Sequence, residues 1–358
     1  MAQYLLAAEA DRIQDFIFRS AKLREVVGGS QLLTRFCHEV TSLLGVKPEN
    51  VVISDAGSFR ILFDSKEEAC EFGNLLAEAY HRATGGSLTV AEPVPVSGHF
   101  GAASDEAEEA LRRAKRRREG WESPEHVPYM AFCASCGTGL AVAHTAYHED
   151  EGPQYLCASC LNKSAEQAEQ KAADLESFLG GFYRIVVGDD LGRYDWPGKK
   201  KLPGRTEADP LEDVAAYDDR RYVAYLLADG NNMGKVFGGC RNRKQMRRLS
   251  DGLREVIRQA LAVPARLIME RNPLDDRHDF IPVLPLILGG DDVFVLVPAP
   301  WALDFAFRFA REYEAGMKKL LEDAGLQPEE PPTVSVAVVI CKSKHPYRLA
   351  HETGERRL

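Results

Sequence analysis

The chain has 358 residues and a net charge of −9, with 45 basic and 54 acidic residues and 45% apolar content. This length predicts two or three compact units with an ordinary buried core. No apolar run approaches a membrane span, and the N-terminal residues lack a signal-peptide profile, so we expect a cytoplasmic protein without membrane contact. The acidic balance excludes a uniformly basic surface. Two basic runs, 112–118 and 241–248, could contact phosphates or form solvated helix faces.

The first third of the chain alternates strand and helix patterns. We expect strands at 4–8, 51–54, 59–63 and 87–96, helices at 13–18, 32–40 and 66–82, and a turn at 55–58. The order β-α-α-β-β-α-β is that of a ferredoxin-like or palm domain. With a further helix at 103–118, this pattern predicts a first palm domain over residues 1–118.

The texture changes between residues 119 and 215, where proline, glycine, charged residues and a cysteine cluster surround one expected helix near 165–179. This segment is interpreted as an insert or linker. The earlier pattern then returns, with strands expected at 221–228, 280–288, 293–298 and 333–341 and helices at 246–270 and 301–321. A second palm domain is therefore predicted over 216–358. The expected fold class is α+β, with two ferredoxin-like palm domains in tandem and an intervening four-cysteine zinc unit.

Four of the eight cysteines form two Cys-x-x-Cys pairs, Cys133 with Cys136 and Cys157 with Cys160. Two such knuckles supply the four thiolates that tetrahedral Zn²⁺ prefers, and a site with four protein ligands leaves no position for water. We therefore predict a structural zinc that holds together an insert poor in apolar residues. Two redox-active pairs are the alternative reading. The other four cysteines are interpreted as packing residues.

The strongest chemical signal is Gly289-Gly290-Asp291-Asp292, which lies between two apolar strand patterns. The glycines permit a tight turn and close approach of a triphosphate. Adjacent aspartates on an apolar hairpin repel one another unless a cation lies between them. This pattern predicts a divalent metal, Mg²⁺ or Mn²⁺.

A further acid, Asp229, ends the strand at 221–228. In a β-α-β-β order this strand lies beside the hairpin, so Asp229, Asp291 and Asp292 are the predicted catalytic residues and metal ligands. Nucleotide phosphates are expected on the segment that follows and on the hairpin glycines: Gly230, Asn231, Asn232, Gly234, Lys235, Gly289 and Gly290. The alternative is a glycine-rich hairpin beside an unrelated turn. In the first half, Asp55-Ala56-Gly57-Ser58 occupies the matching turn with one acid, so that domain is expected to be degenerate.

These features together resemble a known family. The tandem palms, the four-cysteine insert, the runs Asp-Gly-Asn-Asn-Met-Gly and Gly-Gly-Asp-Asp, and the early segments 13–17 and 28–33 are similar to the large polymerase/cyclase subunit of type III CRISPR effector complexes. The resemblance implies a nucleotide cyclase-like fold and conversion of ATP to cyclic oligoadenylate, a second messenger of antiviral defence. It also implies that Ser30, Gly57 and Ser58 face a second nucleotide, and that effector subunits and guide or target RNA are possible partners.

The sequence departs from this family in three places. The first palm starts near residue 4 with no histidine–aspartate nuclease pattern before it, so a compact form without the HD nuclease domain is expected. The C-terminal helical domain of the family also has no counterpart, and the chain ends where the last palm helix is expected. Two alternative functions stay open at this point: a GTP-using enzyme related to diguanylate cyclases, and a non-catalytic scaffold that binds nucleotide and RNA.

Overall fold

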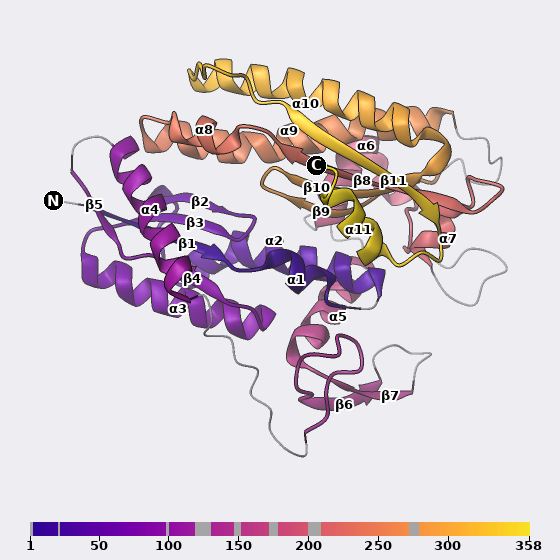
Figure 1. Cartoon of the computed structure of the whole chain (residues 1–358), viewed down its shortest axis with the longest axis horizontal. Helices are drawn as coiled ribbons and strands as arrows, with labels where there is room; N and C mark the ends of the chain where they lie inside the picture. The colour runs from indigo at the N-terminus through magenta and orange to yellow at the C-terminus, as the bar shows by residue number, and fades with distance from the viewer. Residues whose placement is uncertain are drawn as a thin grey trace. The chain divides into compact units, whose positions relative to one another are not determined.

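The computed structural model describes residues 3–20, 22–97, 100–118, 130–146, 152–171, 178–199, 209–271 and 279–358. The chain divides into two compact units. One unit holds Met1–Glu166 and Phe237–Ser250, and the other holds Gln167–Val236 and Asp251–Leu358. Each unit contains one β-sheet with a β-α-β-β-α-β core, shown in Figure 1. The predicted domain boundaries, 1–118, 119–215 and 216–358, stay a prediction.

The first sheet has the strand order β2-β3-β1-β4, and all of its paired strands are antiparallel. We call its core, β1 through β5, the first module. Its elements are β1 (Gln3–Ala10), α1 (Ile13–Phe18), α2 (Leu23–Leu43), the short 3-10 helix η1 (Pro48–Asn50), β2 (Val51–Asp55), β3 (Ser58–Phe63), α3 (Lys66–Thr84), β4 (Leu88–Val90) and β5 (Val94–Val96). Helix α4 (Phe100–Arg118) follows and packs against β1. This order is ferredoxin-like, as predicted.

Alternation along β1 and β3 separates the two faces of the first sheet. Leu6 and Ala8 of β1 and Ile61 of β3 belong to a buried cluster that also includes residues of α2 and α3. Because side chains alternate along a strand, Glu9 and Arg60 belong to the opposite face. That face is the one covered by α4, so the polar side of the first module lies between β1 and α4.

The second sheet has the strand order β11-β8-β10-β9, which is the same topology. We call its core the second module. Its elements are β8 (Tyr222–Gly230), α8 (Met233–Gly238), α9 (Arg243–Glu270), β9 (Leu284–Gly289), β10 (Asp292–Pro298), η3 (Ala299–Trp301), α10 (Ala302–Ala324) and β11 (Val334–Lys342), followed by α11 (Tyr347–Glu355). The tandem palm fold class predicted from the sequence is confirmed by this repeated topology and by the four-cysteine cluster between the two modules.

Helices cover both faces of the second sheet. Helices α9 and α10 run side by side (Figure 1), and a Cβ on Gly316 of α10 would lie 2.8 Å from a methyl of Val256 of α9. On the other face, Leu227 of β8 contacts the backbone of Gly354 in α11. Asp229 lies two residues beyond Leu227, so it belongs to the α11 face of β8.

The insert between the modules contains two short elements around the cysteines. Strands β6 (Ala143–Ala146) and β7 (Pro153–Leu156) pair, and α5 (Ala158–Lys171) begins directly after Cys157. The chain continues through α6 (Phe178–Val187), η2 (Gly188–Arg193) and α7 (Pro210–Ala215). No helix in the described ranges is both long and apolar enough to cross a bilayer.

Three element predictions need correction. The helix expected at 32–40 begins at Leu23 and runs through Gly28 and Gly29, because packing against the insert overrides the low helix propensity of glycine. The strand expected at 87–96 is two strands, β4 and β5, which pair with different ends of β1 and are separated at Pro93. The helix expected near 165–179 starts at Ala158, where the cysteine cluster fixes its first turn, and Phe178 starts a different helix.

The two hairpins differ in their turn chemistry. In the first, Asp55 pairs with Ser58, and both central residues, Ala56 and Gly57, have positive φ. This is the pattern of a type I′ turn, which matches the twist of its strands. A Cβ on Gly57 would lie 2.7 Å from a methyl of Ile13 and 2.9 Å from the Cβ of Ala10. Glycine at 57 is therefore explained by conformation and packing within the first module.

We predict that Gly57→Ala destabilises the protein by about 2–4 kcal/mol, because backbone strain and overpacking add. Gly45→Ala is the matched control. Gly45 also has positive φ (+81°), but nothing lies within 4 Å of its Cβ position. Its substitution should cost only the strain, about 1–2 kcal/mol. Urea unfolding of both variants measures the difference, and equal losses would contradict the packing argument.

Candidate active site and metal centre

The two acidic strand ends predicted from the sequence lie next to each other. Strand β10 pairs with β8 so that Val293 faces Ala228, and the two-residue turn Gly290-Asp291 joins β9 to β10. A Cβ placed on Gly230 would lie 2.9 Å from the Cβ of Asp291. Glycine at position 230 therefore lets the end of β8 touch the hairpin, and Asp229 shares its neighbourhood with Asp291.

Burial and neighbouring carboxylates raise the pKa of both aspartates of the turn. The pKa of Asp291 is raised first by its partial withdrawal from water and then by the charge of Asp229, against a hydrogen bond from its own backbone. The pKa of Asp292 is raised from 3.8 to about 7 by withdrawal from water and by Asp291, Asp229 and Glu355. The side chain of Asp292 is nevertheless solvent-accessible, so screening moderates the energy involved. These shifts show a negative potential that a cation would relieve.

Among the described residues, no positive side chain neutralises this cluster. Across the residues that the structure describes, Asp229, Asp291 and Asp292 form no ion pair with lysine or arginine. Their oxygens nevertheless do not form a group as compact as the cysteine cluster described below, which is the only one of its kind in the described ranges. Carboxylate oxygens are the donors that Mg²⁺ and Mn²⁺ prefer, so the residue types and charge fit a divalent cation.

A buried phenol, absent from the predicted site, lies beneath the two strand ends. Tyr313 of α10 is 1% exposed, and its oxygen would be 2.8 Å from a Cβ on Gly230. Its hydroxyl donates to the sulfur of Met233 at 3.7 Å. Burial and the charges of Asp291 and Asp229 raise the pKa of Tyr313, so it stays a neutral donor. Its spacing in α10 is that of an ordinary core residue, which explains why the sequence gave no separate signal.

Some residues of the segment predicted to bind phosphate already form contacts within the protein. The backbone N–H of Asn231 donates to Thr333 at 2.8 Å, and the Asn231 amide group bonds to Thr333 and Ser335 of the β11 region. Asn232 has a positive φ of 65° and precedes α8. Lys235 forms an exposed ion pair with Glu330 at 2.9 Å. Such pairs are weak, so the ammonium of Lys235 can exchange partners. Gly234 faces open space.

The residues predicted for a second nucleotide are less exposed than that role requires. Ser30 is 4% exposed within α2, and its carbonyl accepts a hydrogen bond from Thr34. Gly57 packs against Ala10 and Ile13, as described above. Ser58 is half-buried and accepts a long hydrogen bond, 3.5 Å, from Arg60. Nucleotide binding by these three residues stays a prediction.

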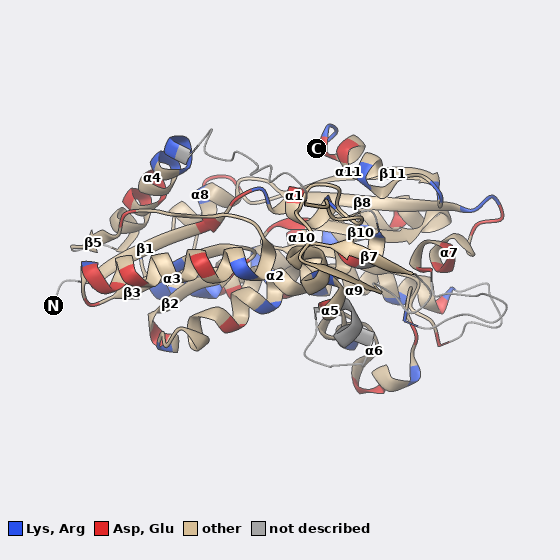
Figure 2. Ribbon diagram, turned by 90° about the horizontal axis from the view of Figure 1, so that it is seen from below, with Lys and Arg blue, Asp and Glu red and all other residues tan. Residues whose placement is uncertain are grey.

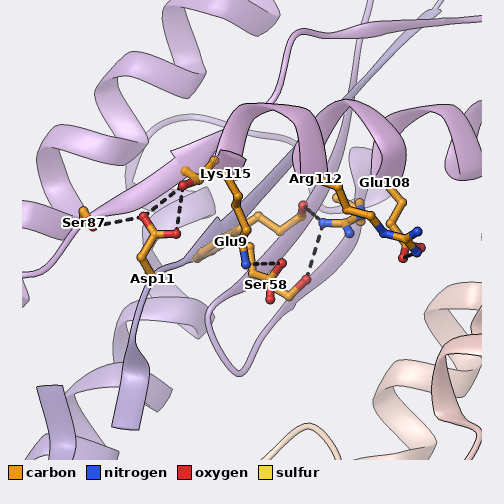
Figure 3. Close-up of polar contacts among 10 residues, drawn as sticks. Glu9, Asp11, Ser58, Ser87, Glu108, Arg112 and Lys115 are labelled. Atoms are coloured by element: carbon orange, nitrogen blue, oxygen red, sulfur yellow. Dashed lines mark hydrogen bonds and ion pairs between the residues drawn. The ribbon is translucent and has the colours of Figure 1, made fainter. Parts of the chain in front are cut away.

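The first module contains an acid at the position of Asp229 that the sequence interpretation missed. Glu9 pairs with Ser58, the residue after the hairpin turn, just as Asp229 lies opposite Asp292. Figure 3 shows Glu9 within a set of charged and polar groups between β1 and α4. Its carboxylate forms an ion pair with Lys115 of α4 at 2.9 Å. Aligning the two predicted modules strand by strand would have found it.

A second cation completes this arrangement. The half-buried Arg60, whose pKa is lowered by its partial withdrawal from water, interacts favourably with Glu9 and Glu108. Nearby, Asp11 accepts hydrogen bonds from Ser87 and Thr89 at 2.8–2.9 Å. In the first module, protein cations thus balance the acid that corresponds to Asp229. The basic run of α4 is partly used in this way, and Figure 2 shows both signs of charge along that helix.

The four predicted cysteines come together. The Sγ atoms of Cys133, Cys136, Cys157 and Cys160 all lie within 4.8 Å of one another, and those of Cys136 and Cys157 are 3.8 Å apart. Tetrahedral Zn²⁺ with Zn–S bonds of about 2.3 Å requires S···S separations near 3.8 Å. Hydrogen bonds among the thiols hold the pKa of Cys136 below its usual range and raise that of Cys157 to about 12.

The surrounding backbone suits thiolate ligands. Gly139 donates its N–H to the Sγ of Cys136 at 3.4 Å, and a Cβ on Gly139 would lie 2.9 Å from the Sγ of Cys157. Cys157 and Cys160 lie at the start of α5, where the helix dipole favours negative charge. The residues therefore fit a structural zinc with four thiolate ligands.

Comparison with known proteins now adds to this geometry. Residues 222–358 match the family model of the Cas10/Cmr2 second palm domain. The second module is therefore similar to the second palm domain of Cas10/Cmr2 proteins. This confirms the family resemblance for the part of the chain that contains the three aspartates. A comparison with curated protein sequences found no match.

Solved structures match the fold of the whole chain. A Csm1–Csm4 cassette in complex with cA4 is 18% identical over 99% of the chain, with a TM-score of 0.61. A cassette with one ATP is 17% identical over 100% of the chain, also with a TM-score of 0.61, and Csm1 of T. onnurineus is 16% identical over 99%, with a TM-score of 0.59. The chain spans about half of each of those chains, 51–52%. At this identity the matches establish the fold alone.

The acidic cluster of the second palm predicts a pH-dependent stability. Because the pKa of Asp292 is higher in the folded state, the folded protein retains this proton more tightly, and stability falls as the pH rises from about 4 to about 7. Asp292→Asn should therefore stabilise the metal-free protein above pH 7, by on the order of 1 kcal/mol after screening is allowed for. The gain should shrink between pH 7 and pH 4.

Thermal unfolding in EDTA from pH 4 to pH 8 measures this effect. Asp219→Asn, at an exposed turn of the same unit, is the control and should show no such dependence. A gain for Asp292→Asn that does not vary with pH would contradict the electrostatic account.

The cysteine cluster predicts one zinc per chain. Cys160→Ser should lose the metal and destabilise the unit that contains the first module, because metal binding and folding of the insert are coupled. Cys70→Ser, which changes an exposed cysteine outside the cluster, should retain the full metal content. Elemental analysis of purified protein measures both, and full zinc content in Cys160→Ser would refute the assignment of that ligand.

Proposed function

We propose that the chain is a metal-dependent nucleotidyltransferase that converts ATP to cyclic oligoadenylate in CRISPR-type antiviral defence. The observation that carries the proposal is the close approach of the Asp229 strand end to the Asp291 hairpin in a Cas10/Cmr2 second palm, without a protein cation between them. The cA4 and ATP complexes of the structurally similar Csm1–Csm4 cassettes support an adenine nucleotide as the ligand.

In the proposed reaction, Asp229, Asp291 and Asp292 hold Mg²⁺ or Mn²⁺. A divalent cation bound there would lower the pKa of the attacking 3′-hydroxyl and would neutralise negative charge on the triphosphate. The new bond joins the 3′-oxygen to the α-phosphorus of a second ATP. The α–β phosphoanhydride breaks, pyrophosphate departs, and the hydroxyl proton is lost to solvent. A final intramolecular step of the same kind closes the ring.

The chain's own residues position these groups. The contact between Gly230 and Asp291 fixes the separation of the two strand ends, and Tyr313 supports them from the core. Lys235 is proposed to exchange its exposed ion pair with Glu330 for a phosphate. The predicted backbone contacts at Gly289 and Gly290 lie on the turn itself, where Gly290 has a positive φ of 62°. Glycine at the first turn position is the arrangement of a type II′ hairpin and leaves that side of the turn without a side chain.

The first palm is proposed to lack a catalytic metal of its own. Lys115 and Arg60 already balance Glu9, so a dication would have to displace two protein cations there. Membership of an effector complex and contact with guide or target RNA are part of the same proposal, and rest on the family of residues 222–358.

Incubating the protein with ATP and Mg²⁺ or Mn²⁺ tests the proposal directly. Cyclic oligoadenylate should form, and Asp291→Ala with Asp292→Ala should reduce the rate by about 100-fold or more, since the metal ligands are lost. Asp219→Ala is the control. Chromatography and mass spectrometry identify the product.

Two outcomes would redirect the assignment. If the double variant forms as much product as the unmodified protein, Asp291 and Asp292 do not take part in the reaction. Turnover of GTP in place of ATP would favour the diguanylate cyclase-like alternative, while nucleotide binding with no turnover under any activating condition would favour the scaffold alternative.

A further inference from the structure

A fully buried lysine lies beside the cysteine cluster. Lys163 of α5 is 1% exposed, and it is the only buried lysine or arginine in the part of the chain that the structure describes. Its ammonium donates to the carbonyl of Phe16 and to Ser20 at 3.2 Å, and lies 4.3 Å from the centre of the Phe16 ring. Burying an ammonium is costly unless a nearby negative charge compensates it. Its two hydrogen-bond acceptors are uncharged, and the acidic groups that act on it include Cys160 and the buried Glu25.

Metal binding adds negative charge to the cysteine cluster. Four thiols that bind Zn²⁺ release four protons, and the resulting centre carries a net charge of −2. Ser20 bridges the two groups, because its hydroxyl bonds to Lys163 and lies 4.0 Å from the Sγ of Cys160. Lys163 itself follows Cys160 by one helical turn of α5. The hydroxyl of Ser20 therefore lies between the ammonium of Lys163 and the metal ligand Cys160.

A buried carboxylate also lies beside the cluster. Glu25, in the first turn of α2, is 0% exposed. One of its oxygens accepts a hydrogen bond at 2.5 Å from Ser135, which lies between Cys133 and Cys136. The other oxygen has no hydrogen-bond partner among the described residues. Its negative charge repels the metal centre, which has a net charge of −2. Lys163 should therefore strengthen metal binding, and Glu25 should weaken it.

The same lysine explains the second glycine, Gly29, of the early sequence motif. A Cβ on Gly29 would lie 3.3 Å from Cε and 3.6 Å from Cδ of Lys163. Gly29 therefore makes room for the aliphatic stem of Lys163 as it passes α2 to reach Phe16. A second contact, the ion pair of Arg35 with the buried Glu166 at 2.5 Å, holds α5 against α2 further along.

We propose that Lys163 is the positioning residue that balances the charge of the four-cysteine metal centre and links its occupancy to the packing of α1 and α2 in the first palm. Metal binding fixes the start of α5, and the ammonium of Lys163 then holds the C-terminal end of α1 through Phe16 and Ser20. Gly29 and the insert therefore both contribute to this link between metal binding and the packing of the first palm. This role is independent of the nucleotidyltransferase reaction.

Zinc affinity of the full chain, measured by competition with a chromophoric chelator, tests the proposal. Lys163→Met keeps the length of the side chain and removes its charge, and should weaken zinc binding by about 10–100-fold. Glu25→Gln keeps an acceptor for Ser135 and removes a negative charge, and should strengthen binding several-fold. Arg35→Met removes the other contact between α5 and α2, and should change zinc affinity much less than Lys163→Met.

Opposite signs for Lys163→Met and Glu25→Gln support an electrostatic role, because loss of packing alone would weaken binding in both. Unchanged zinc affinity in Lys163→Met, or weaker binding in Glu25→Gln, would overturn the proposal. If Lys163→Met fails to fold, Glu25→Gln decides by itself. Hydrogen exchange is a second measurement. Chelation should increase exchange in α1 and the start of α2 more than in β1 and β3, and uniform or absent changes would refute the link to the palm.

Discussion

The contact between the backbone of Gly230 and the side chain of Asp291 determines the geometry of the acidic site. A strand end and a hairpin turn can approach this closely only where one of them carries no Cβ. Once they do so, Asp229 and the two aspartates of the turn share one small region, and the charge of Asp229 raises the free energy of ionising Asp291 and Asp292. The divalent cation, the buried Tyr313 and the proposed reaction all depend on this approach.

The two palms solve the same electrostatic problem in different ways. Each has an acid at the end of its first strand, Glu9 or Asp229, on the face covered by the helix that follows the last strand. In the first palm that helix supplies Lys115, and β3 supplies Arg60. In the second palm the corresponding helix, α11, supplies Glu355, whose charge adds to that of the aspartates. In the first palm protein cations balance the acid, whereas in the second palm the corresponding helix adds a further negative charge.

Much of this could be predicted from the sequence, because the deciding signals are local. Paired Cys-x-x-Cys motifs and acids at the ends of apolar strands indicate metal binding from the sequence alone. The alternation of side chains along β1 and β8 determines which residues share a face of each sheet. Other features depend on tertiary contacts. Glycines 28 and 29 would ordinarily end a helix, yet α2 continues through them because Lys163 packs there. Tyr313 and Lys163 have the spacing of ordinary helix residues, and only their burial beside charged groups reveals a role.

The pair of positions occupied by Ala10 and Gly57 in the first palm, and by Gly230 and Asp291 in the second, constrains how these domains can diverge. In each palm the two residues are nearly in contact, so only one of them can carry a Cβ. Introducing an acid at Gly57 alone would collide with Ala10, and the compensating glycine at position 10 brings no benefit until the acid is present. Introducing an acidic turn into the first palm thus requires coordinated changes at positions 57 and 10 and a shift of the Ile13 side chain, with an unfavourable intermediate.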